Sequence, residues 1–406
     1  MKKTNRWAQA IWGVLILLFA GLIYAWSVLS SPFAAEYPNW SKGSLSLTFT
    51  LAMSFFCIGG LVAGLLAGKV KEWVICGASA VLFLVGFIIV SSMTNITQLY
   101  LGFGVLAGLG AGFAYNTVMG SVTKWFPDKK GLISGILLMG FGIGAFIIGK
   151  VYAGFLGSFS WREEFKALGV IVCAVILIGG LFVKKPTEEQ VREYVPAETA
   201  NKAAKGADFK TAQMISKASF WLYFVYAILL SAAALALVAQ ASGIVTETSP
   251  NLAAGTIATI VGLISIFNGI GRVIFGGLYD RLGQKKTMLL NCSLYLVSVV
   301  INMAALNAGS LALVVLGFIF FGLSYGGVTP TNSAFIMDFY GVKNYPVNFS
   351  IINLNLLLAS FGGTAAGVIY DKQGTYMTIF VIMIVAIALA IGCTLLIKRP
   401  NEAKNI

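Results

Sequence analysis

Long apolar segments separated by short polar ones make up most of the chain. About twenty apolar residues in helical conformation cross the hydrocarbon core of a bilayer, and such segments recur almost from end to end. We predict twelve membrane-spanning helices, over residues 8–31, 44–68, 74–93, 97–121, 131–155, 165–183, 218–243, 254–278, 286–306, 310–335, 347–370 and 375–397. The pattern therefore predicts an all-α polytopic membrane protein.

One long polar segment, rich in Lys, Glu, Thr and Ala, lies almost at the midpoint of the chain. It divides the predicted helices into six and six. We therefore expect an N-terminal six-helix bundle over residues 1–183, a cytoplasmic linker over 184–217, and a C-terminal six-helix bundle with a short cytoplasmic tail over 218–406.

The composition agrees with a membrane protein and excludes several kinds of chemistry. Charged residues make up 11% of the 406 residues, whereas a soluble domain carries about 25%. The net charge of +13 would suggest nucleic-acid binding if the basic residues shared a soluble face, but they lie between apolar segments. The chain has no histidine, which removes histidine-based catalysis and most zinc sites. We expect no nucleic-acid partner, no metal, no cofactor and no enzymatic activity.

The basic residues indicate the orientation of the helices. With the N-terminus in the cytoplasm, 22 of the 28 Lys and Arg residues lie on the cytoplasmic side, as the positive-inside rule requires. The other six are Lys42, Lys150, Arg162, Lys166, Arg272 and Lys372. We expect a multi-pass protein of the plasma (inner) membrane with both termini in the cytoplasm. The first apolar segment is too long for a cleaved signal peptide and leads directly into another span.

Corresponding loops of the two halves carry related motifs. The loop after the predicted eighth span reads Gly276-Gly-Leu-Tyr-Asp280-Arg281-Leu-Gly283-Gln-Lys-Lys, and the loop after the second reads Gly64-Leu-Leu-Ala-Gly68-Lys-Val-Lys. The later loop resembles the cytoplasmic loop signature of the major facilitator superfamily, and the earlier copy has glycine in place of the aspartate. The resemblance implies the major facilitator fold of two six-helix bundles.

The Asp280 loop has the chemistry of a gate. A carboxylate at the start of a tight turn can accept hydrogen bonds from backbone N–H groups and basic side chains at neighbouring helix ends. We predict a cytoplasmic gate formed by Gly276, Asp280, Arg281 and Gly283. The alternative is that Asp280 and its basic neighbours only anchor the topology.

A second set of motifs extends over nearly the whole chain. It comprises Tyr24-Ala-Trp26, Ala114-Tyr115-Asn116, Lys124-Trp-Phe-Pro-Asp128-Lys-Lys-Gly131, Asn268-Gly-Ile-Gly-Arg272, and Ser324-Tyr325 through Thr331-Asn-Ser333. These strings resemble the oxalate/formate antiporter family of carboxylate transporters. The resemblance implies a secondary transporter, an antiporter or symporter, in which Arg272 binds the anionic substrate.

Arg272 also stands out by its position. A charged residue at the centre of a span costs about 2.5–3.5 kcal/mol, and Arg272 lies eight residues, or about 12 Å, before the Asp280 loop. At 100° per residue it shares one helix face with Ser265, Asn268 and Tyr279. A guanidinium donates two parallel hydrogen bonds to a carboxylate, and Asn268 can add a third. We predict substrate binding by Arg272 and Asn268, with snorkelling of Arg272 towards water as the alternative.

Other spans supply weaker candidates for the substrate site. Tyr24, Tyr115 and Tyr325 lie well inside their spans, and a buried hydroxyl requires a partner. We predict that they contact the substrate or wall its site, with simple packing as an equal alternative. The resemblance places Asn355 or, with one residue of slippage, Leu356 where oxalate-carrying members have a second intramembrane lysine, and neither residue is basic. Lys150 lies near the outer end of its span, where snorkelling is expected.

These residues favour a singly charged substrate. A dianion held by Arg272 alone would keep one carboxylate buried without a countercharge, at a cost of several kcal/mol. We therefore predict transport of a monocarboxylate such as formate, lactate or pyruvate, by a functional monomer in the lipid bilayer. The alternatives are an oxalate/formate exchanger and, more distantly, a non-transporting membrane sensor. No Asp or Glu lies deep within a predicted span, which disfavours coupling through a carboxylate but leaves exchange and proton coupling both open.

Overall fold

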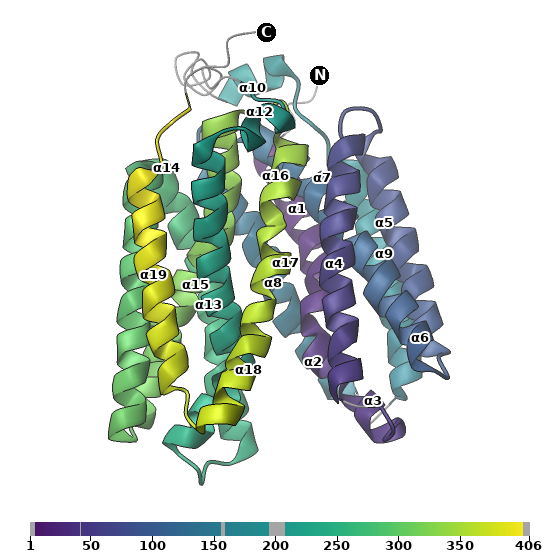
Figure 1. Ribbon diagram of the computed structural model, residues 1–406. Helices are drawn as coiled ribbons and strands as arrows, with labels where there is room; N and C mark the ends of the chain where they lie inside the picture. The colour runs from purple at the N-terminus through teal and green to yellow at the C-terminus, as the bar shows by residue number, and fades with distance from the viewer. Residues whose placement is uncertain (1–4, 41, 156–158, 195–207, 401–406) are drawn as a thin grey trace. The chain divides into compact units, whose positions relative to one another are not determined.

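The computed structural model describes residues 5–40, 42–155, 159–194 and 208–400, and the regular structure within these segments is helical (Figure 1). The chain forms two compact units. Unit 1 comprises residues 1–128, 136–205 and 345–351, and unit 2 comprises residues 129–135, 206–344 and 352–406. The division follows the two halves of the sequence except for two short segments, 129–135 and 345–351, each of which belongs to the unit built mainly from the other half.

Unit 1 contains six long helical segments with short helices between and after them. Its elements are α1 (Arg6–Ala20), η1 (Gly21–Ala25), α2 (Trp26–Leu29), α3 (Ser31–Glu36), α4 (Lys42–Leu66), α5 (Glu72–Ser91), α6 (Ile96–Leu99), η2 (Tyr100–Ala107), α7 (Gly108–Val122), η3 (Thr123–Trp125), most of α8 (Lys130–Phe155), α9 (Trp161–Phe182) and α10 (Glu188–Tyr194).

Unit 2 is built mainly from long helices. Its elements are α12 (Thr211–Ile215), α13 (Ala218–Thr248), α14 (Ala254–Ala308), α15 (Leu311–Tyr340), the end of α16 (Tyr345–Asn353), α17 (Asn355–Ala359), α18 (Phe361–Gln373) and α19 (Met377–Leu396). In the part of the chain described, eleven helical segments are long and apolar enough to cross a membrane.

The longest of these segments accounts for two of the twelve predicted spans. It covers Thr259–Ala308 and contains Gly283, whose φ of 76° and ψ of 175° interrupt the helix. Phe275 and Asn291 would be about 24 Å apart along a straight helix. Instead, a Cβ on Gly327 of α15 would lie 2.7 Å from Phe275 and 2.8 Å from Asn291. The chain therefore folds back at Gly283, and the all-α prediction with twelve crossings is confirmed.

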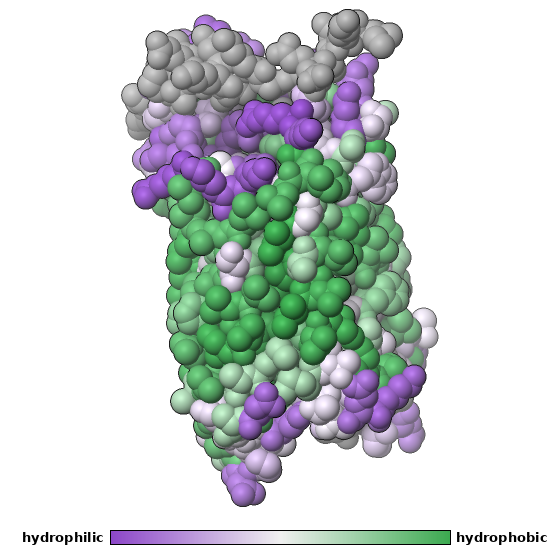
Figure 2. Space-filling view, turned by 60° about the vertical axis from the view of Figure 1, so that its left-hand side comes forward, coloured by the Kyte–Doolittle hydropathy of each residue, from purple (hydrophilic) through white to green (hydrophobic). Residues whose placement is uncertain are grey.

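The outer surface of unit 2 has the polarity expected of a lipid-facing protein. Figure 2 shows an apolar band between two hydrophilic ends on the face that carries α14 and α19. Exposed side chains on α14 include Ile266, Ile270 and Ile274, spaced by one helical turn, and α19 contributes Val385 and Leu389. Apolar side chains exposed in this regular pattern are explained by hydrocarbon as the surrounding solvent.

One helix boundary differs from the prediction in a way that matters below. The sixth span was expected to begin at residue 165, whereas α9 begins at Trp161, because Ser160 caps the helix. The Ser160 side chain accepts a hydrogen bond from the backbone N–H of Glu163, whose own side chain accepts one from the backbone of Ser160. This reciprocal capping satisfies N–H groups that would otherwise be unpaired at the helix start. Glu164 therefore lies in the first turn of this helix, at one end of the segment that is long and apolar enough to cross a membrane.

Candidate functional site

The residues around Arg272 are positioned by a close contact between α14 and α15. A Cβ on Gly326 would lie 2.2 Å from the backbone oxygen of Asn268, and a Cβ on Gly271 would lie 2.2 Å from the backbone oxygen of Leu323. Only glycine allows the two backbones to approach this closely, which is how small residues bring helices together in lipid. The contact fixes the Asn268–Arg272 turn against α15.

Arg272 and Asn268 form a hydrogen-bonded pair on this turn. The Arg272 Nε atom donates to the Oδ1 atom of Asn268 at 3.0 Å. Asn268 is 8% exposed, and its Nδ2 atom is buried with no hydrogen-bond partner among the described residues. Arg272 itself is half-buried. The pair thus orients the guanidinium plane and leaves one buried amide donor beside it.

The other members of the predicted polar face lie in different surroundings. Ser265 is exposed. Tyr279 is buried, and its hydroxyl donates to an oxygen of Asp338 at 3.4 Å. Among the three residues expected to share a face with Arg272, Asn268 accepts a hydrogen bond from it.

Tyr325 and Asn355 also belong to unit 2. Tyr325 precedes Gly326, whose Cβ would lie 2.2 Å from the Asn268 oxygen and 2.9 Å from the Arg272 backbone nitrogen. Asn355 is fully buried, accepts a hydrogen bond from the Ser231 hydroxyl at 3.2 Å and donates to the Ile352 carbonyl at 2.6 Å. Tyr325 is therefore placed next to Arg272, whereas both polar atoms of Asn355 are engaged within unit 2. Their roles in binding stay predictions.

Tyr24 and Tyr115 share an aromatic cluster in unit 1. Both rings pack edge-on against Phe141, with centroid distances of 5.5 and 5.1 Å. The Tyr115 ring also stacks on Phe349 at 5.7 Å and meets Phe56 at 5.0 Å. Sequence reasoning missed the three phenylalanines, because phenylalanine is common in every span and carries no periodic signal that distinguishes a cage from packing.

Two of the four predicted gate residues, Gly276 and Asp280, meet the start of α8 within unit 2. The two Asp280 carboxylate oxygens accept hydrogen bonds from the backbone N–H groups of Gly131 and Leu132, each at 2.8 Å. A Cβ on Gly276 would lie 2.2 Å from the backbone oxygen of Gly131. A negative charge capping a helix start is favourable, so Asp280 fastens residues 129–135 to α14.

The other two gate residues have simpler surroundings. Gly283 supplies the left-handed backbone conformation at which α14 reverses, which glycine adopts without steric cost. Arg281 is exposed.

The corresponding loop of unit 1 is held differently. Gly68 stands at the position of the aspartate, and a side chain there would meet nothing within 4 Å. The start of α16 is instead bound by Asn116 of α7, whose Nδ2 atom donates to the Pro346 carbonyl at 2.9 Å, while the Ser350 hydroxyl donates to the Gly60 carbonyl at 2.9 Å. Asn116 belonged to a quoted motif but was not predicted as a site residue.

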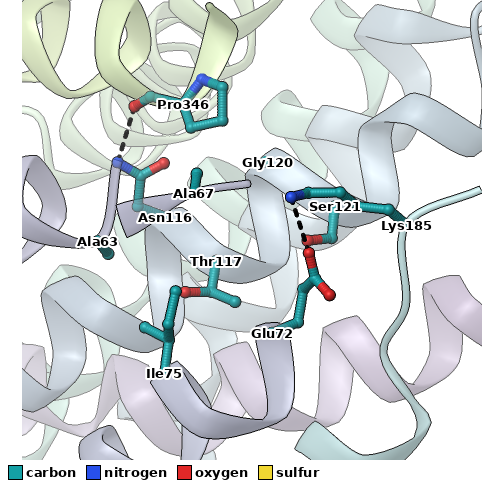
Figure 3. A pocket seen from close by; sticks show the side chains of 10 residues that line it. All are labelled: Ala63, Ala67, Glu72, Ile75, Asn116, Thr117, Gly120, Ser121, Lys185 and Pro346. Carbon is teal, nitrogen blue, oxygen red and sulfur yellow. Dashed lines mark hydrogen bonds and ion pairs between the residues drawn. The ribbon is translucent and has the colours of Figure 1, made fainter. Parts of the chain in front are cut away.

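A small pocket of about 10 Å³, partly open to solvent, lies beside Asn116 in unit 1, and Figure 3 shows the side chains that line it. The ion pair between Lys185 Nζ and Glu72 Oε1, 2.9 Å long, lies at one side of it. None of the predicted binding residues lines this cavity. Lys150 is also separate from it: its exposed ammonium lies 5.0 Å from the ring centroid of Phe146.

The fold and these buried polar groups define a class of protein, the polytopic membrane transporters. Residues 11–364 match the family model of the Major Facilitator Superfamily, and the chain belongs to this superfamily. Its architecture is similar to that of the proton:xylose symporter XylE, with a TM-score of 0.77 and 11% identity over 98% of this chain and 97% of that one. The predicted major facilitator fold is confirmed, and the relatives are transporters rather than enzymes.

Curated relatives cover most of the chain. The MFS-type transporter YhjX of Escherichia coli is 25% identical over 88% of this chain and 86% of its own. The oxalate:formate antiporter of Oxalobacter formigenes is 24% identical over 84% of this chain and 80% of its own. Monocarboxylate transporter 13 of Rattus norvegicus is 21% identical over 96% of this chain and 89% of its own. The predicted similarity to the oxalate/formate antiporter family is confirmed.

Proposed function

We propose that this protein is a secondary active transporter of small monocarboxylates, of the formate, lactate or pyruvate type, and that Arg272 binds the substrate carboxylate. The observation that carries the proposal is the Arg272–Asn268 pair, in which the buried Asn268 Nδ2 donor has no partner in the described part of the chain. The substrate would bind during alternating access of the two halves, as in other transporters of this architecture.

The chemistry of the pair suits a carboxylate. Because Nε is bonded to Asn268, the plane of the guanidinium is set, and its outer edge is the part that engages a carboxylate through two parallel hydrogen bonds. A buried donor without a partner costs about 1–3 kcal/mol, so the Asn268 Nδ2 atom favours a ligand that offers an acceptor. A carboxylate oxygen meets both requirements.

The charge balance favours one carboxylate rather than two. Asn355 is neutral and its polar atoms are already engaged, so it offers no countercharge for a second carboxylate. The names of the relatives point to the same substrate class, since one is a monocarboxylate transporter and another an oxalate:formate antiporter. Oxalate/formate exchange is the second candidate and is favoured by the latter relative.

The proposal includes the cellular setting. Because 22 of the 28 basic residues fall on one side of the predicted spans, both termini would lie in the cytoplasm and the protein in the plasma membrane. Each chain contains both six-helix halves, so the functional unit would be a monomer.

The test is counterflow in proteoliposomes. Vesicles loaded with unlabelled formate, lactate, pyruvate or oxalate are diluted into the same labelled compound, which removes any need for a driving force. The proposal expects accumulation of at least one monocarboxylate and little of oxalate. Accumulation of oxalate alone would favour the exchanger, and accumulation of none of the four would contradict carboxylate transport.

The Asp280 cap completes the proposal as a cytoplasmic gate. Replacing Asp280 by Asn removes the charge that caps α8, worth about 0.5–2 kcal/mol. A gate predicts a changed maximal counterflow rate at an unchanged half-saturating concentration, whereas a topological anchor predicts no change in either. Asp371→Asn, which alters an exposed carboxylate at the end of α18, is the matched control.

A further inference from the structure

A glutamate in unit 1 is buried, and no described residue donates a hydrogen bond to its carboxylate. Glu164 lies in the first turn of α9, is 7% exposed, and has both carboxylate oxygens buried with no hydrogen-bond partner in the described part of the chain. Its neighbour Glu163 provides the contrast, because it is exposed and accepts hydrogen bonds from the backbone N–H and hydroxyl of Ser160 at 2.9 and 2.7 Å.

The charged groups near this end of α9 are engaged with partners other than Glu164. Arg162 pairs with Glu36 at 2.7 Å and donates to the Tyr37 hydroxyl at 2.9 Å, and the indole of Trp161 also donates to Glu36. Lys166, on the following turn of α9, is exposed. The cationic groups of this region therefore leave Glu164 without a countercharge.

Among the described residues, the elements packed against α9 supply no countercharge for Glu164 either. α1 and α5 pack against it, and their charged residues are Arg6 and Glu72, which pair with Asp128 and Lys185. The other titratable group of α5, the Cys76 thiol, packs at Gly180, sixteen residues and about 24 Å along α9 from Glu164. From α8, the Tyr152 ring packs edge-on against Phe165, the residue after Glu164, and its hydroxyl donates to the Leu29 carbonyl at 3.5 Å.

We infer that Glu164 is a proton-binding site that couples transport to a proton. An ionised carboxylate buried without a partner costs far more than the neutral acid, so such a group is buried with its proton. Ionisable residues inside a span are expensive and generally functional. In the buried surroundings described here the carboxylate holds one proton as the neutral acid, and on exposure to water it releases that proton.

This inference rests on the proposed function and extends it. One proton moved with one monocarboxylate anion gives a transport step with no net charge. A pH gradient would then drive uptake, whereas a membrane potential would not. The sequence could not indicate this site, because the predicted sixth span began one residue after Glu164.

The test compares two modes of transport in proteoliposomes of wild type, Glu164→Gln and Glu163→Gln. Counterflow of a labelled monocarboxylate reports binding and exchange, and uptake driven by an alkaline interior reports coupling. We expect several-fold stimulation by the gradient in wild type and in Glu163→Gln. Glu164→Gln, which mimics the neutral acid, should keep counterflow within about twofold of wild type and lose the stimulation.

The outcomes separate the two proposals. Absence of counterflow in wild type contradicts carboxylate transport itself. Wild-type counterflow without stimulation by the gradient, or stimulation that persists in Glu164→Gln, overturns the proton site. If Glu164→Gln loses both modes, thermal unfolding in detergent is measured between about pH 5 and pH 9. An unfolding midpoint that falls as the pH rises in wild type and Glu163→Gln, but not in Glu164→Gln, supports the proton site. Equal pH dependence of the midpoint in all three proteins refutes it.

Discussion

Replacement of Arg272 by lysine separates the role of its charge from that of its shape. Lysine keeps the positive charge but offers a single ammonium in place of the planar fork. It also cannot reproduce the hydrogen bond from Nε to the Asn268 Oδ1 atom, which is 3.0 Å long. The guanidinium plane would no longer be fixed, and one of two parallel bonds to the substrate carboxylate would be lost.

The expected loss follows from the strength of that bond. A hydrogen bond to a charged group contributes about 1.5–3 kcal/mol, so Arg272→Lys should weaken substrate binding about 10- to 150-fold. Arg272→Gln removes the charge as well and would leave the carboxylate buried without a countercharge, at several kcal/mol. It should weaken binding by more than about a thousandfold.

The assay is the concentration dependence of counterflow in proteoliposomes, with protein insertion measured on the same vesicles. Arg192→Lys is the matched control, because Arg192 lies on α10 with its side chain 76% exposed. Its half-saturating concentration should equal that of wild type. If Arg272→Gln shows the same counterflow as wild type, substrate binding does not require the Arg272 guanidinium. That result would refute the assignment of Arg272 as the carboxylate-binding residue.

Three further predictions test packing, charge and pH. Asn355→Lys should shift preference from monocarboxylates towards dicarboxylates in competition assays, and an unchanged preference would contradict the charge balance. Gly326→Ala should lower the free energy of unfolding by about 1–3 kcal/mol, because its Cβ would lie 2.2 Å from the Asn268 oxygen. Gly262→Ala, where nothing lies within 4 Å, should be tolerated, and equal unfolding midpoints would disprove the steric argument. The hydrogen bond from Trp161 and the interactions with Arg162 lower the pKa of Glu36. The ionised Glu36 therefore stabilises the fold fully at pH values above the ordinary pKa of a glutamate, and this contribution is lost as the pH falls through the lowered pKa. Thermal unfolding of Glu36→Gln should therefore differ from wild type at neutral pH and converge with it in acid, and a constant difference would contradict this assignment.

The two related loop motifs, at Gly64–Gly68 and Gly276–Asp280, are held by different side chains, which their similar sequences do not reveal. Gly64 and Gly276 occupy matching places in the two motifs, and each is closely approached by the start of another helix, at Pro346 and Gly131. The sequence indicated that the carboxylate was missing from the first copy. It could not indicate that Asn116 binds the Pro346 carbonyl, because the two residues are 230 positions apart.

Hydropathy and charge determined the membrane class of this protein, because burial in lipid demands apolar segments of a length that can be counted. They also singled out Arg272, whose charge inside a span is costly enough to require an explanation. The tertiary structure alone decided which partners the polar groups acquire. It engaged both polar atoms of Asn355, and it gave the Asn268 Nδ2 atom and the Glu164 carboxylate no partner among the described residues. The physical reason is that solvation and hydrogen bonding depend on neighbours in space, and these come from helices far apart in the chain.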